Sequence, residues 1–161
     1  MAIEKVREYL KKFGLDGNIR EFKVSSATVE LAAAALNTEE ARIAKTVSLK
    51  GKEGGCILIV TAGDTKIDNR KFRERFGMKP KMLSFEEVPV FTGHVVGGVC
   101  PFANPKDAEV WLDQSLRRFE TVFPACGSAN SAIELTPDIL YEISNARGWV
   151  DVCKPSISPS V

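Results

Sequence analysis

The sequence predicts a mixed α/β fold in which helices surround a curved, barrel-like sheet with largely antiparallel or mixed strands. Segments with helical and with strand periodicity alternate irregularly along the chain, and short turns join several of the strand segments. A doubly wound parallel sheet would need long crossovers between successive strands, so the short turns disfavour it. No interdomain linker interrupts the 161 residues, which indicates one domain over residues 1–153 and a flexible tail over residues 154–161.

The first part of the chain alternates between helix and strand. Apolar residues recur at helical spacing over residues 3–13, and Gly14 follows as a stop signal, so we expect a short amphipathic helix there. Residues 19–24 have the composition of a strand. The alanine-rich residues 29–36 have high helix propensity and follow two serines that could cap a helix.

Two adjacent strands follow, joined by a glycine-rich hairpin. Apolar and polar residues alternate over residues 43–50, as in a strand with one buried face. The continuous apolar run over residues 56–61 suits a central strand that is covered on both faces. Lys45 shares the parity of the apolar residues, so its ammonium group either meets a partner in a cleft or marks an exposed strand start.

The middle of the chain contains two helix-start signals. Thr65 and Asp68 have the spacing of a capping box, which predicts that they open a basic helix. Ser84 and Glu87 have the same spacing and indicate a single helical turn, which we expect Pro89 to interrupt.

The last part of the chain predicts further strands and a final helix. Residues 110–116 and 119–124 are rich in residues that favour strands. Thr136 and Pro137 supply an N-cap and a first-turn proline for the last helix. Residues 149–153 suit an edge strand.

Composition limits the classes of function. The charged N-terminus lacks the apolar core of a signal peptide, and no apolar run could span a membrane, so we expect a cytoplasmic protein without a membrane partner. The chain has 22 Lys and Arg against 21 Asp and Glu. This weak net charge permits a grip on the end of an RNA but disfavours wrapping of duplex DNA.

The sequence predicts neither a metal nor a cofactor. Four widely spaced cysteines without a C-x-x-C pair, together with one histidine, cannot complete a zinc cluster. A Walker loop, a dinucleotide fingerprint and paired catalytic carboxylates are also missing from the sequence.

Three segments could carry chemistry besides Lys45. The first is a loop that we call the glycine loop, formed by Gly97, Gly98, Val99, Cys100 and Pro101. Its backbone amides, unshielded by side chains at the glycines, could receive a developing oxyanion, although the same residues are common in turns. Cys100 and His94 could form a thiol nucleophile with its base, but a free cysteine is more often a small buried hydrophobic residue.

The third segment is a loop of small residues before the last helix, residues 127–131, which we call the late loop. Its uncharged hydrogen-bonding groups could hold an amino group or a ribose hydroxyl, and hairpin turns use the same residue types. The candidate binding residues in it are Gly127, Ser128 and Asn130.

Taken together, Ala44-Lys45-Thr46, the Gly97-x-x-x-Pro101 loop and the late segment SANSAIELTPDIL resemble the YbaK/EbsC family of aminoacyl-tRNA deacylases in order and spacing. The resemblance covers roughly residues 1–150. It implies a curved barrel-like sheet, related to the editing domain inserted in bacterial prolyl-tRNA synthetases, and hydrolysis of mischarged tRNA in trans.

The resemblance also implies residue roles. Lys45 matches the strand lysine most closely tied to activity, and the loop from Gly97 to Pro101 matches the backbone that holds the ester carbonyl. Thr46 and the late loop match positions of the pocket. An acidic residue that is common before the I-E-L triplet is replaced here by Ala132, so the amino acid removed and the tRNA identity stay open.

The predicted partner is therefore the acceptor end of an aminoacyl-tRNA carrying a small amino acid such as alanine or cysteine, and an aminoacyl-tRNA synthetase is a candidate second partner. Two other classes compete with this hypothesis. One is a non-catalytic module that binds a nucleotide, an RNA end or an amino acid in the same pocket. The other is a thiol-dependent hydrolase of small esters that uses Cys100 and His94.

Overall fold

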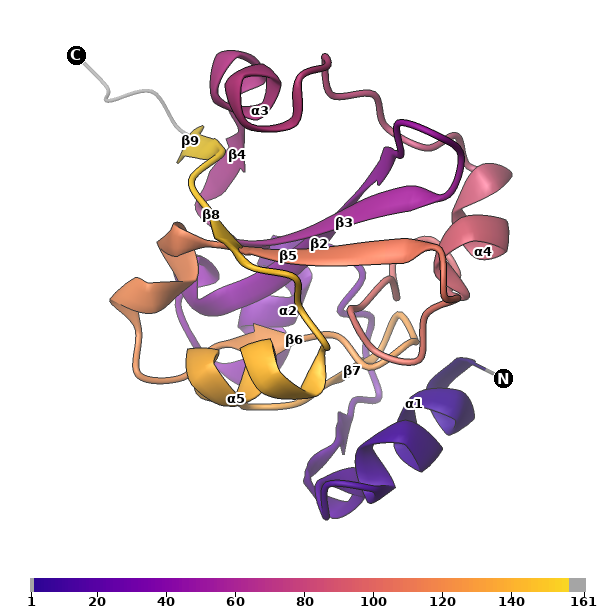
Figure 1. Cartoon of the computed structure of the whole chain (residues 1–161). Coiled ribbons are helices and arrows are strands. Elements are labelled where there is room, and N and C mark those ends of the chain that lie inside the picture. Colours follow the sequence, from indigo (N-terminus) through magenta and orange to yellow (C-terminus); the bar gives the residue numbers. More distant parts are fainter. Residues whose placement is uncertain (1, 157–161) are drawn as a thin grey trace, which may run out of the picture.

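The computed structural model describes residues 2–156, which fold around one five-stranded mixed sheet and two small two-stranded sheets (Figure 1). In chain order the elements are α1 (Ala2–Lys11), η1 (Asp16–Asn18), β1 (Arg20–Glu21), α2 (Val29–Leu36), η2 (Glu40–Arg42), β2 (Ile43–Lys50), β3 (Cys56–Ala62), β4 (Thr65–Ile67), α3 (Asn69–Phe76), α4 (Glu87–Thr92), β5 (Ala108–Asp113), η3 (Gln114–Arg118), β6 (Phe123–Pro124), β7 (Ser131–Ala132), α5 (Pro137–Ile143), β8 (Trp149–Val150) and β9 (Cys153–Pro155).

The central sheet has the strand order β6-β2-β3-β5-β8. Only β2 and β3 are antiparallel, and they are the pair joined by the predicted hairpin. The pairs β2–β6, β3–β5 and β5–β8 are parallel. The mixed α/β class and the expected mixed sheet are therefore confirmed, whereas the alternative of a largely antiparallel sheet is not, because three of the four pairs in the central sheet are parallel. Strand direction depends on how the longer connections cross the sheet, and strand patterning carries no information about that.

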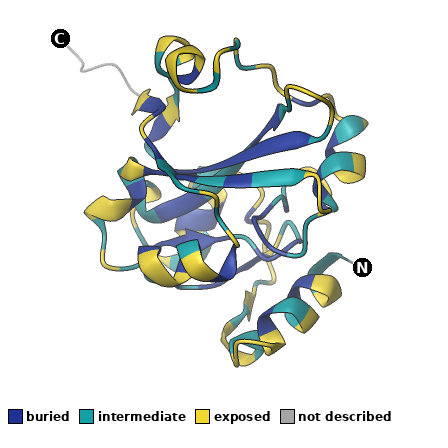
Figure 2. Cartoon of the chain, viewed as in Figure 1, coloured by how far each residue is buried: buried dark blue, intermediate teal, exposed yellow. Residues whose placement is uncertain are grey.

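The core fills both faces of the central sheet. β3 is buried along its whole length, as Figure 2 shows, because alternate residues contact different layers. Ile57 and Ile59 pack with Phe72 of α3, whereas Leu58 and Val60 belong to a larger cluster that includes Leu10 of α1 and residues of α5. The central strand predicted from the apolar run is confirmed.

Several predicted strands are shorter in the structure. Within the expected strand over residues 19–24 only Arg20 and Glu21 form a strand, and within residues 119–124 only Phe123 and Pro124 do. Val122 adds an isolated antiparallel bridge to Leu135. The strand expected over residues 110–116 ends at Asp113, whose carboxylate accepts a hydrogen bond from the Ser115 N–H (2.9 Å) and so starts η3. A side-chain cap that competes with the strand ladder explains this early end.

The two helix-start signals behave differently. Asp68 alone caps α3 by accepting from the amides of Arg70 and Lys71, while Thr65 pairs in β4, so the Thr65 part of the predicted capping box is wrong. The Ser84 and Glu87 box is confirmed, because each side chain bonds the backbone N–H of the other. Pro89 does not interrupt α4, since it lies in the first turn, where its missing N–H has no intrahelical acceptor.

The C-terminal region extends the fold beyond the expected boundary. Lys154 and Pro155 lie in β9, which pairs antiparallel with β4, so the predicted flexible tail is wrong at these two residues. Ser156, the next residue of that tail, donates its backbone N–H to the carbonyl oxygen of Asp64 (2.9 Å), and residues 157–161 lie outside the described residues. Between residues 2 and 156, every helix is too short or too polar to cross a bilayer.

Candidate active site

One cavity of about 470 Å³ lies between α2, β2, the segment before α4 and the glycine loop. Its lining is mostly apolar, with hydroxyl groups and one ammonium group among the alkyl side chains. Lys45 is the one titratable side chain among the described residues that line it. The lining residues are Ser26, Ala27, Thr28, Val29, Ala32, Ile43, Ala44, Lys45, Thr46, Val47, Ser48, Met82, Leu83, Phe85, Val88, Val96, Gly97, Val99, Phe123, Ala125, Ser131 and Ala132.

Lys45 lies half-buried in the wall of this cavity. β2 carries it, paired opposite Thr61 of β3, and its ammonium group donates a hydrogen bond to the backbone oxygen of Thr65. Burial lowers the pKa of Lys45 from its ordinary value, and this is opposed by the electrostatic effects of Cys153, Asp64 and Glu30. The alternative of an exposed strand start is therefore wrong, and the cation is held next to the cavity.

The glycine loop contributes Gly97 and Val99 to the lining of the cavity. Gly97 has a φ of +91°, a conformation that favours glycine. Within residues 2–156 neither the Gly97 nor the Val99 backbone N–H has a hydrogen-bond acceptor. The Gly98 N–H differs, because it donates to the carbonyl oxygen of Val95 (3.0 Å). Of the loop amides considered, those of Gly97 and Val99 can receive a carbonyl oxygen, and that of Gly98 is already engaged.

Gly98 has a different role, as the point where two loops touch. A Cβ atom at this position would lie 2.8 Å from three backbone atoms of Ser128. The glycine loop and the late small-residue loop are therefore in direct backbone contact, which only a residue without a side chain permits. Asn104 also holds this region, since its side chain donates to the carbonyl oxygens of Thr92 (2.8 Å), the last residue of α4, and of Cys100 (3.0 Å) in the glycine loop.

Two hydroxyl groups in the cavity wall have no hydrogen-bond partner within the part of the chain that the structure describes. These are Ser26 Oγ and Thr46 Oγ1, and both atoms are buried. A buried hydroxyl without a partner costs free energy, so such groups in a cavity wall are suited to bind a polar ligand. The sequence pointed to Thr46 but not to Ser26, because the serine pair suggested only a helix cap. The observed cap of α2 is Thr28, which leaves the Ser26 side chain available.

The late loop mainly supports the cavity from outside. Ser128 and Asn130 are not among its lining residues, whereas Ser131 is. The hydroxyl groups of Ser128 and Ser131 lie 2.6 Å apart, and the side chain of exposed Asn130 donates to the Phe22 carbonyl oxygen (2.9 Å). Gly127 is buried against α1, where a Cβ atom would lie 2.9 Å from a methyl group of Val6.

Cys100 and His94 are close together, but they lie outside the cavity lining. Both are buried, with Cys100 Sγ 3.4 Å from His94 Nε2. The same Nε2 is 2.7 Å from the carbonyl oxygen of Phe102. Because a carbonyl only accepts, Nε2 must carry the proton, and the lone pair is on Nδ1, which has no partner. Burial also raises the pKa of Cys100 to about 12 and lowers the pKa of His94. This geometry opposes a thiolate and imidazolium dyad.

Pro101 is also buried and lies outside the cavity lining. The structure therefore brings together Lys45, Thr46, Gly97 and Val99 from the predicted site. The remaining predicted site residues, Gly98, Cys100, Pro101, Gly127, Ser128 and Asn130, lie behind or beside the cavity.

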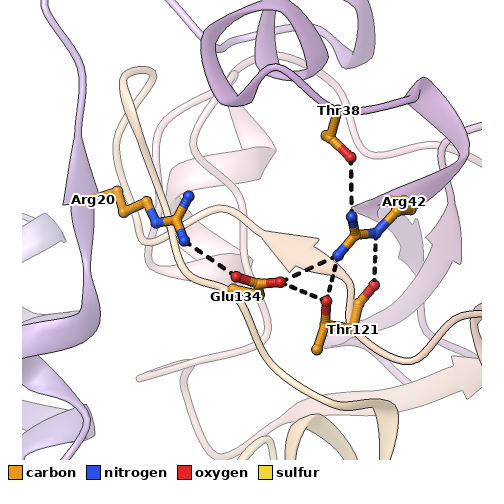
Figure 3. Close-up of polar contacts among 5 residues, drawn as sticks. All are labelled: Arg20, Thr38, Arg42, Thr121 and Glu134. Carbon is orange, nitrogen blue, oxygen red and sulfur yellow. Dashed lines mark hydrogen bonds and ion pairs between the residues drawn. The ribbon is translucent and has the colours of Figure 1, made fainter.

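A polar network joins Arg20, Thr38, Arg42, Thr121 and Glu134 (Figure 3). Glu134 is its centre, with carboxylate oxygens 3.1 Å from Arg20, 3.2 Å from Arg42 and 2.6 Å from the Thr121 hydroxyl. The Arg42 guanidinium lies 4.9 Å from the centre of the Phe123 ring, and Phe123 lines the cavity. The network therefore fixes the wall formed by Phe123. No local pattern in the sequence pointed to Arg20, Arg42 or Thr121.

Comparisons with known proteins agree with this arrangement. The family profile described as the aminoacyl-tRNA editing domain matches residues 24–143. YwhH of Bacillus subtilis, a protein of uncharacterised function, is 53% identical over 154 residues, which cover 96% of this chain and 98% of YwhH. EbsC of Enterococcus faecalis, a proposed Cys-tRNA(Pro)/Cys-tRNA(Cys) deacylase, is 26% identical over 74% of each chain.

A solved structure resembles this one over almost the whole chain. The crystal structure of a proposed trans-editing enzyme for prolyl-tRNA synthetase superposes with a TM-score of 0.85 at 25% identity, and the match covers 95% of this chain and 97% of the other.

Proposed function

Because the chain belongs to the aminoacyl-tRNA editing domain family, we propose that it removes a small wrong amino acid, such as alanine or cysteine, from mischarged tRNA in trans. The names of EbsC and of the solved relative favour tRNA(Pro) or a related tRNA as the carrier. An aminoacyl-tRNA synthetase is the natural second partner, since it would present the mischarged product.

One observation carries the proposal. The half-buried ammonium group of Lys45 lines the same cavity as Gly97 and Val99, whose backbone N–H groups have no acceptor within residues 2–156. A cation and preformed N–H donors in a mostly apolar pocket are what the developing negative charge of an ester carbonyl requires.

In the proposed mechanism the loop amides polarise the ester carbonyl, and Lys45 orients the terminal adenosine or the attacking water. Water adds to the carbonyl carbon, the bond between that carbon and the ribose oxygen breaks, and the leaving ribose oxygen takes up a proton that comes from the attacking water. Among the described residues that line the cavity, none has a carboxylate or an imidazole. The neighbouring ribose hydroxyl of the substrate therefore serves as the group that activates water.

Pocket size selects the amino acid. The side chains of Ala32, Ile43 and Phe123 belong to one apolar cluster, and all three residues line the cavity. One additional methylene changes binding in such a pocket by only ~1–3 kcal/mol, so we expect preference for small residues with some overlap between alanine and cysteine.

The experiment is a deacylation assay with a panel of mischarged tRNAs. Changing Lys45 to Ala should abolish ester loss, whereas changing exposed Lys52 in the hairpin to Ala should leave it unchanged. Retained turnover in Lys45→Ala removes Lys45 from the mechanism. The rival hypothesis is a non-catalytic binding module, which is favoured by the lack of a carboxylate or imidazole among the described residues that line the cavity. Saturable binding of the mischarged tRNAs without any turnover by the parent protein would support it.

A further inference from the structure

The segment from β4 to the residue before Met82 is strongly basic. Residues 65–81 contain seven Lys or Arg against two Asp or Glu. The rest of the chain contains 15 basic against 19 acidic residues, so the net charge of +1 hides a positive segment on an otherwise acidic protein. A surface that serves only solubility would have both signs interspersed. The seven basic residues are Lys66, Arg70, Lys71, Arg73, Arg75, Lys79 and Lys81, of which all but Lys71 are exposed.

This segment is adjacent to the active site at both of its ends. At its start, the Thr65 carbonyl accepts the hydrogen bond of Lys45, and Lys66 follows immediately. At its end, Lys81 precedes Met82, which lines the cavity. Figure 1 shows α3 between these ends, packed beside β4 and β9. A polyanion whose end enters the cavity would therefore pass next to these side chains.

Several of these charges are not neutralised by the protein. Arg70 pairs with Glu74, and Lys71 pairs with Asp151. Within residues 2–156, by contrast, Lys66, Arg73, Lys79 and Lys81 have no carboxylate partner. These four cations are available to an external ligand.

The strand pair next to α3 contains an unfavourable charge arrangement. Lys66 of β4 lies directly opposite Lys154 of β9, and both are exposed. Like charges directly opposite in a sheet are destabilising. Among residues 2–156 neither lysine has a carboxylate within ion-pair distance, although the charge of Lys154 helps to lower the pKa of Asp68. A bound phosphate between them would remove the repulsion.

We propose that this basic surface, made by Lys66, Arg73, Lys79, Lys81 and Lys154, binds backbone phosphates of the tRNA acceptor arm while the aminoacylated end occupies the cavity. The inference rests on the proposed function for the identity of the polyanion. Phosphate contacts of this kind position an RNA without reading its sequence, which suits an enzyme whose selectivity lies in the amino-acid pocket.

The test compares a long and a short substrate. The triple variant Arg73→Gln, Lys79→Gln, Lys81→Gln should lower kcat/KM for full-length aminoacyl-tRNA by about 10- to 100-fold at low salt and reduce the slope of log affinity against log salt by about 2 to 3. Turnover of a 3′-aminoacyl-adenosine fragment, which lacks the arm, should stay within about two-fold. The matched control is Lys11→Gln, Lys23→Gln, Lys106→Gln, which removes the same charge from exposed sites elsewhere.

The outcomes separate this inference from the proposed function. The inference is overturned if kcat/KM of the triple variant falls equally on tRNA and on the fragment, or if it does not fall at all. It is also overturned if the triple variant and the control lose kcat/KM equally. If the parent protein deacylates nothing, binding of uncharged tRNA still tests the surface, and loss of that binding in the triple variant alone supports it. Lys66→Gln should weaken tRNA binding and yet raise Tm, a combination that a purely structural lysine would not produce.

Discussion

The ammonium group of Lys45 donates a hydrogen bond to the backbone oxygen of Thr65, across the boundary between the central sheet and the small sheet of β4 and β9. This bond holds a long, flexible side chain in one position at the cavity wall. It also links the residue that we place in the active site to the first residue of the basic segment. The position of the Lys45 side chain therefore depends on the position of β4. Because β9 pairs with β4, this strand pair helps to hold Lys45 at the cavity wall.

The lowered pKa of Lys45 predicts a loss of activity on the alkaline side. Burial disfavours the charged form, so the ammonium group is lost as pH rises through a value below the ordinary 10.5. We expect kcat/KM, corrected for spontaneous ester hydrolysis, to fall across that pH range. In Lys45→Arg the guanidinium stays charged, so any residual activity should lack this alkaline limb. An unchanged limb in that variant would assign it to another group.

The same shift has a consequence for stability with a defined sign. Because the folded-state pKa lies below the unfolded-state pKa, the buried charge destabilises the fold at neutral pH. This cost begins to fall as pH rises through the folded-state pKa and is gone above the ordinary value of 10.5. We expect Lys45→Met to gain free energy of unfolding relative to the parent at pH 7, and this gain should be smaller above the folded-state pKa of Lys45. Chemical denaturation at the two pH values measures it.

The unpartnered hydroxyl groups of Ser26 and Thr46 predict opposite effects on activity and stability. Removing a buried hydroxyl that has no partner relieves a desolvation cost, so Ser26→Ala and Thr46→Val should be at least as stable as the parent. If the hydroxyls bind substrate, kcat/KM should fall by about 5- to 50-fold in each. Denaturant titration and deacylation kinetics provide the two readouts. Loss of stability in step with activity would indicate a structural role instead.

Gly98 predicts a variant that fails for reasons of space. In Gly98→Ala the new methyl group would lie 2.8 Å from the backbone of Ser128, so the two loops must separate. We expect a loss of about 1–3 kcal/mol in the free energy of unfolding, and a lower kcat because the Gly97 and Val99 amides move with the loop. Gly17→Ala is the control, since nothing lies within 4 Å of a Cβ there. Equal stability of both variants would contradict the close approach.

Cys100 predicts an active alanine variant. Its thiol is fully buried, has a pKa raised to about 12 and faces a protonated nitrogen of His94. Cys100→Ala should therefore keep deacylation within about three-fold of the parent while losing about 1–2 kcal/mol of stability from the small void. Alkylation of the folded parent should be slow. Near-complete loss of turnover by a stably folded Cys100→Ala would restore the thiol hydrolase hypothesis.

Local signals in the sequence predicted the elements whose determinants are local. The hairpin between β2 and β3, the proline-capped α5 and the parity of Lys45 all depend on residues a few positions apart, and the structure contains each of them. Parity placed Lys45 on a buried face, but its acceptor is Thr65, 20 residues away. A partner so distant in sequence follows only from the paths of β3 and β4.

The missed features depend on contacts between distant segments. Ser26 faces the cavity because its backbone N–H bonds the Ala129 carbonyl (2.6 Å), more than one hundred residues away. Arg42 meets Thr121 and Glu134 for a similar reason, since parallel pairing places β2 beside β6. No periodicity in one sequence specifies which strands become neighbours in parallel, so the polar network and the second cavity hydroxyl could not be predicted.

The network around Glu134 predicts a pH-dependent loss of stability. The pKa of Glu134 is lowered, chiefly by the hydrogen bond from Thr121 and then by the charges of Arg20 and Arg42. A lowered carboxyl pKa contributes stability at neutral pH that is lost as pH falls from the ordinary 4.5 through the lowered value. Since the side chain is 37% exposed, solvent screens the pair, and we expect Glu134→Gln to cost only about 0.5–1 kcal/mol at pH 7.

The effect of Glu134→Gln should therefore vanish once the parent carboxyl is protonated, and urea titrations at pH 7 and near pH 3 would show this convergence. Glu142→Gln, at an exposed site on α5, should cost nothing measurable at either pH. Because Arg42 packs over the Phe123 ring, a loosened network should also let the cavity wall move. We expect weaker discrimination between alanyl and larger aminoacyl esters in Glu134→Gln, with kcat for the small ester little changed, since the change does not touch Lys45 or the loop amides. A constant selectivity ratio would show that Phe123 keeps its position without the network.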